Sequence, residues 1–560
     1  MSTAPRRPTA LDAIAEDHFS ALLRLQPALA LSVGAPDPAP GLGDRSPAGL
    51  AELADLARST LAAVDAAPVT DDVDRVTAAA LRERLGVELE LHEAGEDLGE
   101  LNVIASPVQD LRMVFDLVPT ASEDDWADAA GRLASVPAAV DGYVESLRAA
   151  AARGRVAAVR QVEACAAEAA SYAAGDGFFA AFAASAAVDG APLDGTLAAD
   201  VAGGAAAAAQ AYEGLAAFLR TELLPQAPAA DACGADRYRL FSRYFLGAAV
   251  DLAETYAWGL DEVARLREEM ARTAREVTGS PDVAAAAAAL DADPATVVTG
   301  APAFRDWMQQ RSDETVEALA GTHFDVPEQV RRLECRIAPT TGGGIYYTGP
   351  SEDFSRPGRM WWAVPPGQTT FSTWREATTV HHEGVPGHHL QVGQAAVRAE
   401  VLNRWRRQGC WVSGHGEGWA LYAERLAADL GFLHGPGEVL GMLDAQLLRA
   451  ARVVIDVGVH CGFDAPAEVG GGAWTYGKAW AYLTSCSGNH EDVLRFELDR
   501  YLGWPGQAPS YKVGERLWWS VRAEVQRREG AAFDLVAFHR RALDLGSVGL
   551  DVLRDALLTP

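Results

Sequence analysis

The sequence predicts a mainly α-helical protein with one small β element, and three observations lead to this prediction. Its 560 residues suffice for several domains or for one large helical body with a deep cleft. Alanine- and leucine-rich segments dominate the first 300 residues, and their apolar residues recur every three or four positions, as in amphipathic helices. A Gly-, Tyr- and Trp-rich passage from Cys335 to Val364 interrupts this pattern and is typical of strands joined by loops.

Six helices are predicted in the first half of the chain from this periodicity. The alanine-heavy stretches among them favour helices over disordered linkers, because alanine has the highest helix propensity. No repeat of 20 to 50 residues indicates a solenoid. The predicted helices cover residues 50–66, 71–94, 127–152, 156–174, 201–211 and 283–290.

The second half is expected to carry the chemistry, because twelve of the fourteen tryptophans and most of the histidine clustering lie beyond residue 300. Strands are predicted at residues 342–347 and 360–364. We expect residues 1–330 to form a helical N-terminal lobe and residues 331–560 a catalytic, metal-binding lobe of one continuous unit. Further helices are predicted to begin near residue 373 and to cover residues 418–430, 439–460, 474–485, 492–502 and 510–528.

Composition excludes several classes of protein. A net charge of -29 would repel phosphate backbones and anionic membrane surfaces, so neither nucleic acid nor a membrane is an expected partner. Residues 1–16 lack the continuous apolar stretch of a secretory signal, which predicts a cytoplasmic protein. The six cysteines are scattered without a C-x-x-C pair, so we expect reduced thiols. The oligomeric state stays open.

A metal site is predicted around the sequence His-His-Glu-Gly-Val-Pro-Gly-His-His at residues 381–389. Four of the twelve histidines lie there. Imidazole nitrogens and carboxylates are ligands of Zn²⁺, and a histidine followed by glutamate opens the H-E-x-x-H helix, where the glutamate is a general base. The alternative is a solvated helix end. We expect His382 as the first ligand, Glu383 as the base, and one Zn²⁺ per chain.

The second ligand is less obvious, because the position one helical turn after His382 is Pro386. Proline interrupts a regular helix, so we expect a bulge or break there. This change would bring His388 to the ion. In a straight helix His389 would lie two turns, about 10 Å, along the axis from His382, so we favour His388 and keep His389 as the alternative.

The third ligand is predicted to be Glu417, within His-Gly-Glu-Gly-Trp at residues 415–419. Small glycines on both sides would allow the metal a close approach. The alternative is an acidic residue that favours a helix N-terminus. Glu424 is expected either in a supporting position or in a surface ion pair with Arg425.

These motifs, together with Glu417–Tyr422, Trp504–Ala508 and Tyr511–Gly514, resemble the bacterial family known as domain of unknown function 885. The resemblance spans most of the chain. It implies a two-lobed helical fold like that of the zincin metallopeptidases, and a distant similarity to carboxypeptidase Taq and angiotensin-converting-enzyme-like peptidases. Those enzymes use the compact H-E-x-x-H, whereas this chain has a longer spacing.

The function expected from these residues is hydrolysis of a short peptide or peptide-like small molecule. Zinc would activate a water, and Glu383 would accept its proton. Tyr511 is expected to donate to the developing oxyanion; the alternative is an aromatic residue packed at a helix start. Arg452, Asp456 and His460 are spaced at i, i+4 and i+8 and are expected to form a charged, hydrogen-bonded row in which His460 supports the site, or alternatively a surface ion-pair row. The predicted substrate contacts are Tyr346, Tyr347, Arg356 and Arg359.

Two other functions remain open. A pseudoenzyme or metal-binding protein could keep the fold and the ion without turnover, although the intact Glu383 argues against it. A mononuclear iron oxidoreductase would also use His and Glu, whereas the paired E-x-x-H of di-iron bundles is missing from the sequence.

Overall fold

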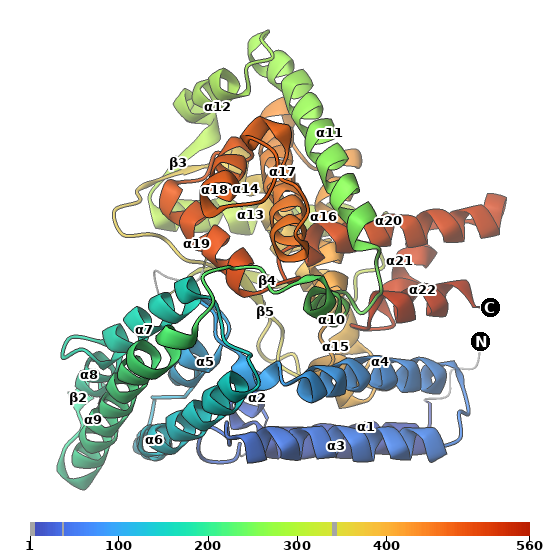
Figure 1. Ribbon diagram of the computed structural model, residues 1–560. Helices are drawn as coiled ribbons and strands as arrows, with labels where there is room; N and C mark the ends of the chain where they lie inside the picture. Colours follow the sequence, from blue (N-terminus) through green and yellow to red (C-terminus); the bar gives the residue numbers. More distant parts are fainter. Residues whose placement is uncertain (1–5, 36–37, 339–343, 560) are drawn as a thin grey trace.

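The prediction of a mainly helical protein is confirmed. The computed structural model describes residues 6–35, 38–338 and 344–559, which fold into long helices and a few short strands (Figure 1). Gly342 and Gly343, expected at the start of the first strand, lie outside the described residues.

The first helices form a layer at one edge of the molecule, where α1, α3 and α4 pack side by side (Figure 1). Polar residues set their ends. Thr9 and Asp12 form a capping box on α1, and Gly95 takes the left-handed conformation that ends α4. The layer comprises α1 (Ala10–Leu25), α2 (Pro27–Ser32), α3 (Pro47–Ala66) and α4 (Asp72–Ala94).

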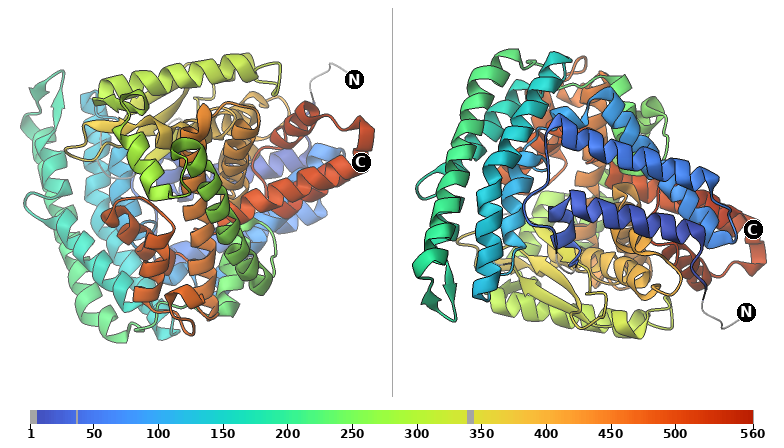
Figure 2. Two further views of the ribbon diagram at one scale, coloured as in Figure 1. Left: turned by 90° about the horizontal axis from the view of Figure 1, so that it is seen from above. Right: turned by 90° about the horizontal axis from the view of Figure 1, so that it is seen from below.

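A second group of helices stands along one side of the molecule in both views of Figure 2. Its core is separate and contains Trp126, Tyr143 and Tyr212, which are all buried. The long helices α6 and α9 pack against each other. The group comprises α5 (Pro107–Met113), α6 (Glu123–Ala152), α7 (Val159–Ala173), α8 (Phe178–Ala184), the hairpin β1 (Ala187–Val188) and β2 (Ala191–Pro192), and α9 (Gly195–Phe218).

The largest core surrounds helix α17 (Gly435–Cys461). Apolar residues lie on all faces of this helix, as expected for a helix that other elements cover on every side. It packs on α11 and α14 and contacts α16, α19 and α20. The helices around it are α10 (Ala235–Leu246), α11 (Leu252–Thr278), α12 (Val283–Ala292), α13 (Ala301–Leu319), α14 (Thr373–Glu383), α15 (His388–Val397), α16 (Ser413–Asp429), α18 (Tyr476–Ser485), α19 (Glu491–Gly503), α20 (Ser510–Glu529), α21 (Leu535–Leu543) and α22 (Leu550–Leu558).

The β element lies directly before α14, as predicted, but its main sheet is mixed and not purely antiparallel. Its central strand β6 pairs antiparallel with β5 and parallel with β4. Met360 on β6 therefore lies opposite Tyr347 on one neighbouring strand and Cys335 on the other. A separate antiparallel pair, β3 and β7, leads into α14. The strands are β3 (Val297–Thr299), β4 (Leu333–Ile337), β5 (Ile345–Thr348), β6 (Gly358–Trp362) and β7 (Thr370–Ser372).

The hydrophobic cores group the chain differently from the expected lobes 1–330 and 331–560. Buried residues of α1, α3 and α4, such as Leu11, Phe19 and Leu81, belong to the same core as α17 and α20. Residues 101–223 supply most of the separate second core. The N-terminal layer is therefore packed onto the part of the chain that carries the histidine cluster.

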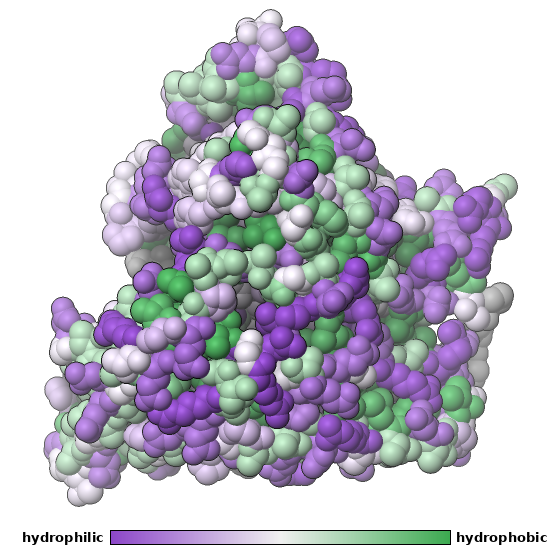
Figure 3. All heavy atoms as spheres, in the orientation of Figure 1, coloured by the Kyte–Doolittle hydropathy of each residue, from purple (hydrophilic) through white to green (hydrophobic). Residues whose placement is uncertain are grey.

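The surface shows hydrophobic side chains scattered among hydrophilic ones on the face drawn in Figure 3. None of the described helices combines the length and the hydropathy of a membrane span.

Candidate metal centre

Three predicted ligands converge in one place. One donor atom each of His382, His388 and Glu417 lies within 4.8 Å of the other two. Glu417 Oε2 is 3.4 Å from His382 Nε2 and 3.5 Å from His388 Nε2. The two imidazole rings are perpendicular, with centroids 4.8 Å apart. Two imidazoles and a carboxylate form the donor set of a catalytic zinc site.

The two histidines meet because the helix breaks between them. His382 lies in the last turn of α14 and His388 begins α15, so the loop Gly384–Gly387 replaces the regular helix that Pro386 forbids. In this loop the Gly387 amide donates to the His381 carbonyl over 3.1 Å. A Cβ atom at Gly387 would lie 1.9 Å from the His382 carbonyl oxygen, so this tight return requires glycine.

His389 points away from the ligands. Its Nε2 donates to the Val330 carbonyl over 2.7 Å, and its Nδ1 lies 2.9 Å from the Tyr347 hydroxyl. It is buried, and burial lowers its pKa to about 4. The structure thus brings His388, and not His389, to the other two ligands.

Because His388 and His389 have different surroundings, their alanine variants should lose different properties: zinc affinity in one and thermal stability in the other. His388→Ala should lose zinc affinity, because it removes a donor. His389→Ala should keep most of it but lower the unfolding temperature, since the buried Val330 carbonyl loses its partner, at about 1–3 kcal/mol. Zinc titration calorimetry and thermal unfolding of both variants measure this. The opposite pattern of zinc loss would contradict the ligand assignment.

Glu424 supports the first ligand from behind. Its Oε1 is 2.7 Å from His382 Nδ1, and its Oε2 accepts from the Thr378 hydroxyl over 2.9 Å. Glu424 is 1 % exposed, whereas Arg425 pairs with Glu269 over 2.7 Å. The supporting role is therefore correct and the surface ion pair is wrong. Holding Nδ1 in this way directs Nε2 of His382 toward the centre.

The two carboxylates beside His382 favour positive charge at the centre. Burial lowers the pKa of His382, but Glu417 and Glu424 outweigh this and raise it to about 10. Burial raises the pKa of Glu417, but His382 and His388 hold it well below its usual range. Glu417 Oε2 is buried and makes no hydrogen bond within the described part of the chain. The imidazole nitrogens stand slightly beyond good hydrogen-bond distance from it, which suits a shared ion.

Glu383 is the free carboxylate of the site. It ends α14 next to His382, is 6 % exposed, and makes no hydrogen bond or ion pair with a described residue. Burial raises its pKa, although His382 and His388 partly offset this. Such a carboxylate is suited to accept a proton.

Tyr511 comes close to the centre through a contact between two helices. A Cβ at Gly418 would lie 2.5 Å from the backbone of Gly514, so the two glycines allow α16 and α20 to touch. Burial raises the pKa of the Tyr511 hydroxyl, and the negative charge of Glu417 raises it further. The hydroxyl therefore stays protonated and can donate.

The predicted substrate contacts divide into two kinds. Tyr347 is engaged with His389, and Arg359 donates to Glu334 over 3.0 Å. Tyr346 is 37 % exposed and stacks on Trp361, and the Arg356 guanidinium makes no contact of hydrogen-bond length with a described residue. Among the described residues, Tyr346 and Arg356 are therefore more available to a substrate than Tyr347 and Arg359.

The predicted hydrogen-bonded row on α17 is wrong, because each member binds a different partner. Arg452 donates to Glu497 over 2.7 Å, and Asp456 accepts from the Tyr238 hydroxyl over 2.7 Å.

His460 is also engaged elsewhere. Its Nδ1 accepts from the Cys233 amide over 3.2 Å, and its Nε2 lies 2.9 Å from the Tyr501 carbonyl oxygen. Burial lowers its pKa to about 4. The structure therefore does not bring His460 into contact with the three ligands.

Sequence reasoning missed two residues beside the centre. The Arg449 guanidinium has one loose ion pair, 3.8 Å from Glu424, and its Nε is buried without a partner in the described residues. Its charge lowers the pKa of Glu383. Trp411 is 50 % exposed, and its ring centroid lies 6.1 Å from that of His388. Arg449 lies one helical turn before Arg452, but no spacing rule in the sequence distinguishes it from the other arginines of the chain.

Comparison with known proteins gives a family and a fold. The family described as "Bacterial protein of unknown function (DUF885)" matches residues 27–557. A crystal structure from Colwellia psychrerythraea is similar over 98 % of both chains, with 23 % identity and a TM-score of 0.82. One from Shewanella oneidensis covers 98 % of this chain and 99 % of its own, with 16 % identity and a TM-score of 0.73. No curated protein matches.

These two structures correct one prediction. Both are described as a "putative lipoprotein", which points away from the cytoplasmic location that the start of the sequence predicted. The cytoplasmic prediction is therefore wrong. An apolar stretch is one of several features that direct a chain to its compartment, so its absence from residues 1–16 does not fix the location. The similarity to zincin peptidases stays a prediction.

Proposed function

Because the chain belongs to the DUF885 family, whose function its description leaves open, we propose from the site itself that the protein is a zinc-dependent hydrolase of short peptides or peptide-like amides. One observation carries this proposal: two histidines and a glutamate converge on one point, and next to the first of them lies the buried carboxylate of Glu383, which is unpaired among the described residues. Zinc hydrolases need this combination of three protein ligands and a general base.

His382, His388 and Glu417 would hold one Zn²⁺, and Glu424 would keep the His382 ring in its orientation. Bound zinc supplies Lewis acidity, which makes water more acidic and polarises a carbonyl group. A net single negative charge on the three ligands leaves the ion cationic, as this chemistry requires.

Glu383 acts as the general base. It takes a proton from the attacking water and returns it to the leaving amine, and its buried position gives it the raised proton affinity that this shuttle needs. Tyr511 donates a hydrogen bond to the oxygen that becomes negative during the attack. Arg356 and Arg449 would contact a carboxylate of the substrate, because neither guanidinium is saturated by described residues.

The proposal is tested with purified full-length protein. Metal analysis should find about one zinc per chain, and the protein should cleave members of a short-peptide library. Removal of the metal with a chelator should stop cleavage, and added zinc should restore it. Zinc binding without cleavage would support a pseudoenzyme, and one equivalent of iron in place of zinc would support the oxidoreductase.

A further inference from the structure

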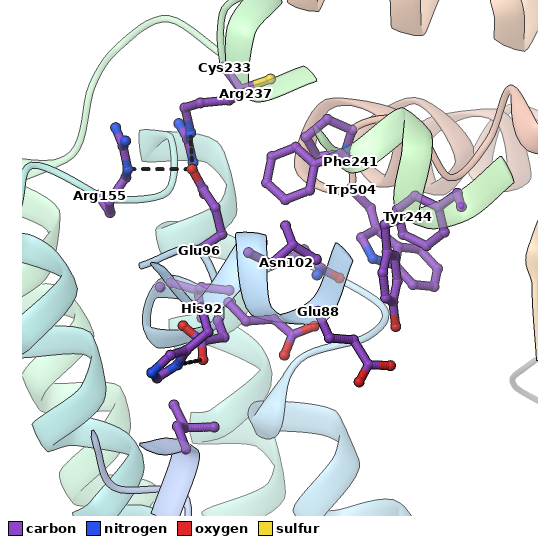
Figure 4. Close-up of a pocket in the computed structure, with 18 of the residues that line it drawn as sticks. Glu88, His92, Glu96, Asn102, Arg155, Cys233, Arg237, Phe241, Tyr244 and Trp504 are labelled. Atoms are coloured by element: carbon purple, nitrogen blue, oxygen red, sulfur yellow. Dashed lines mark hydrogen bonds and ion pairs between the residues drawn. The ribbon is translucent and has the colours of Figure 1, made fainter. Parts of the chain in front are cut away.

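A large cavity lies next to the metal centre but is not lined by its ligands. Its volume is about 590 Å³, and its walls come from α1, α3 and α4 on one side and from α10 and the turn after α19 on the other (Figure 4). Trp411 belongs to its wall and also packs near His388. Pro505 of the same wall precedes α20, which carries Tyr511. A substrate bound at the metal could therefore extend into this cavity.

Two carboxylates of the cavity wall have no partner. The side-chain carboxylates of Glu88 on α4 and of Glu100 shortly after it make no hydrogen bond or ion pair with the residues that the structure describes, and both residues line the cavity. Burial within the fold raises the pKa of each to about 7. A nearby cation would favour their charged forms.

Most other charged groups of the wall already have partners. Glu96 accepts two hydrogen bonds from Arg237 and lies 3.4 Å from Arg155 (Figure 4). His92 Nδ1 lies 2.7 Å from Asp97.

Two arginines lie near the unpaired carboxylates. Arg84 is engaged with Glu83 and with the Tyr244 carbonyl. Arg45 acts on Glu100, whose pKa it lowers. The charge of Arg84 in the same way lowers the pKa of Glu88, so each carboxylate is partly compensated by one arginine.

An aromatic wall stands beside Glu88. Phe241, Tyr244 and Trp504 line this side of the cavity, and Figure 4 shows Glu88 below Tyr244 and Trp504. Carboxylates together with aromatic faces favour ammonium and guanidinium groups, through ion pairing and cation–π attraction. The net charge of -29 also favours the approach of cations over anions.

We propose that this cavity is a specificity pocket for a cationic group of the substrate, a primary ammonium or guanidinium, held by Glu88 against the aromatic wall with Glu100 as a second carboxylate. The inference rests on the proposed function for its substrate class, because it makes the preferred substrates basic peptides or peptides with a free amino terminus. The cationic group can belong to a basic side chain or to the amino terminus of the peptide, and the pocket would bind it through the same contacts in both cases.

The test measures binding apart from cleavage, in the full chain with the Glu383→Gln substitution so that no probe is consumed. Calorimetry compares N-acetyl-Ala-Lys-Ala with its Nε-acetyl-lysine counterpart, and Ala-Ala-Ala with N-acetyl-Ala-Ala-Ala. We expect one cationic probe to bind about 10- to 100-fold more tightly than its neutral counterpart, as hydrogen bonds to charged groups allow. The first pair reports a basic side chain, and the second an amino terminus.

Glu88→Gln should remove most of this preference, and Glu100→Gln should reduce it less because the charge of Glu88 acts more strongly on Tyr244 of the aromatic wall than that of Glu100. Glu93→Gln is the matched control, since Glu93 lies on the same helix, is 66 % exposed, and should leave the preference unchanged. Thermal unfolding shows whether each variant folds.

Three outcomes overturn the inference: equal binding of charged and neutral probes, no binding of any probe, or an unchanged preference in folded Glu88→Gln. The proposed function fails differently. If the protein prefers the cationic probes but cleaves no peptide, the result supports the cation-binding pocket and contradicts the hydrolase function.

Discussion

Glu417→Ala is expected to abolish stoichiometric zinc binding. Among the described residues, Glu417 is the one carboxylate that both histidines approach, at 3.4 and 3.5 Å, and its removal leaves only two imidazole donors for the ion. His382→Ala should have the same effect. Metal analysis after dialysis and zinc titration calorimetry measure the loss, which should exceed a factor of a thousand in affinity, about 4 kcal/mol.

Glu424→Gln serves as the graded control for this experiment. It keeps a side chain of the same shape behind His382 Nδ1 but removes the charge, so the affinity for zinc should fall by about 10- to 100-fold and not disappear. Circular dichroism and thermal unfolding establish that each variant folds. Full zinc occupancy in Glu417→Ala or in His382→Ala would show that the ion, if present, is bound elsewhere.

Glu383→Gln should separate metal binding from catalysis. The amide cannot accept a proton from water, so peptide cleavage should fall by about 10² to 10⁴-fold, the usual contribution of a general base. Zinc content should stay near one per chain, because Glu383 is not among the three converging donors. Rates of peptide cleavage, with zinc measured on the same samples, give both quantities.

Tyr511→Phe provides a comparison for this variant. It removes only a hydrogen-bond donor and keeps the ring that packs 4.8 Å from the Arg452 guanidinium, so its loss in rate should be smaller. Unchanged cleavage in Glu383→Gln would assign the base to another residue, and loss of zinc in this variant would make Glu383 a ligand.

Local sequence was enough to predict most helices of the second half of the chain. The prediction of a helix at 510–528 agrees with α20 (Ser510–Glu529), and that at 439–460 agrees with α17 (Gly435–Cys461). Apolar spacing and end signals such as Pro436 and Gly462 lie within the segments themselves, so no distant contact is needed to read them.

The sheet and the supporting residues depended on distant contacts. Parallel pairing of β4 with β6 joins segments separated by β5, and no periodicity within a strand reports its partner. Glu424 and Arg425 are adjacent in the chain but make different contacts. Glu424 is hydrogen-bonded to His382, whereas Arg425 pairs with Glu269. The turn of the helix decides which faces inward, and only packing reveals what lies there.

The sequence alone determined the helical class, the family resemblance and the three candidate metal ligands, because donor chemistry and local spacing can be recognised from residues that are close in the chain. The tertiary structure decided that the chain breaks after Glu383 and directs His388 inward while Val330 and Tyr347 hold His389 away. It also joined Glu88 of α4 to the aromatic wall of α10 in one cavity. Such groupings arise from burial of surfaces far apart in the chain, and therefore no local pattern contains them.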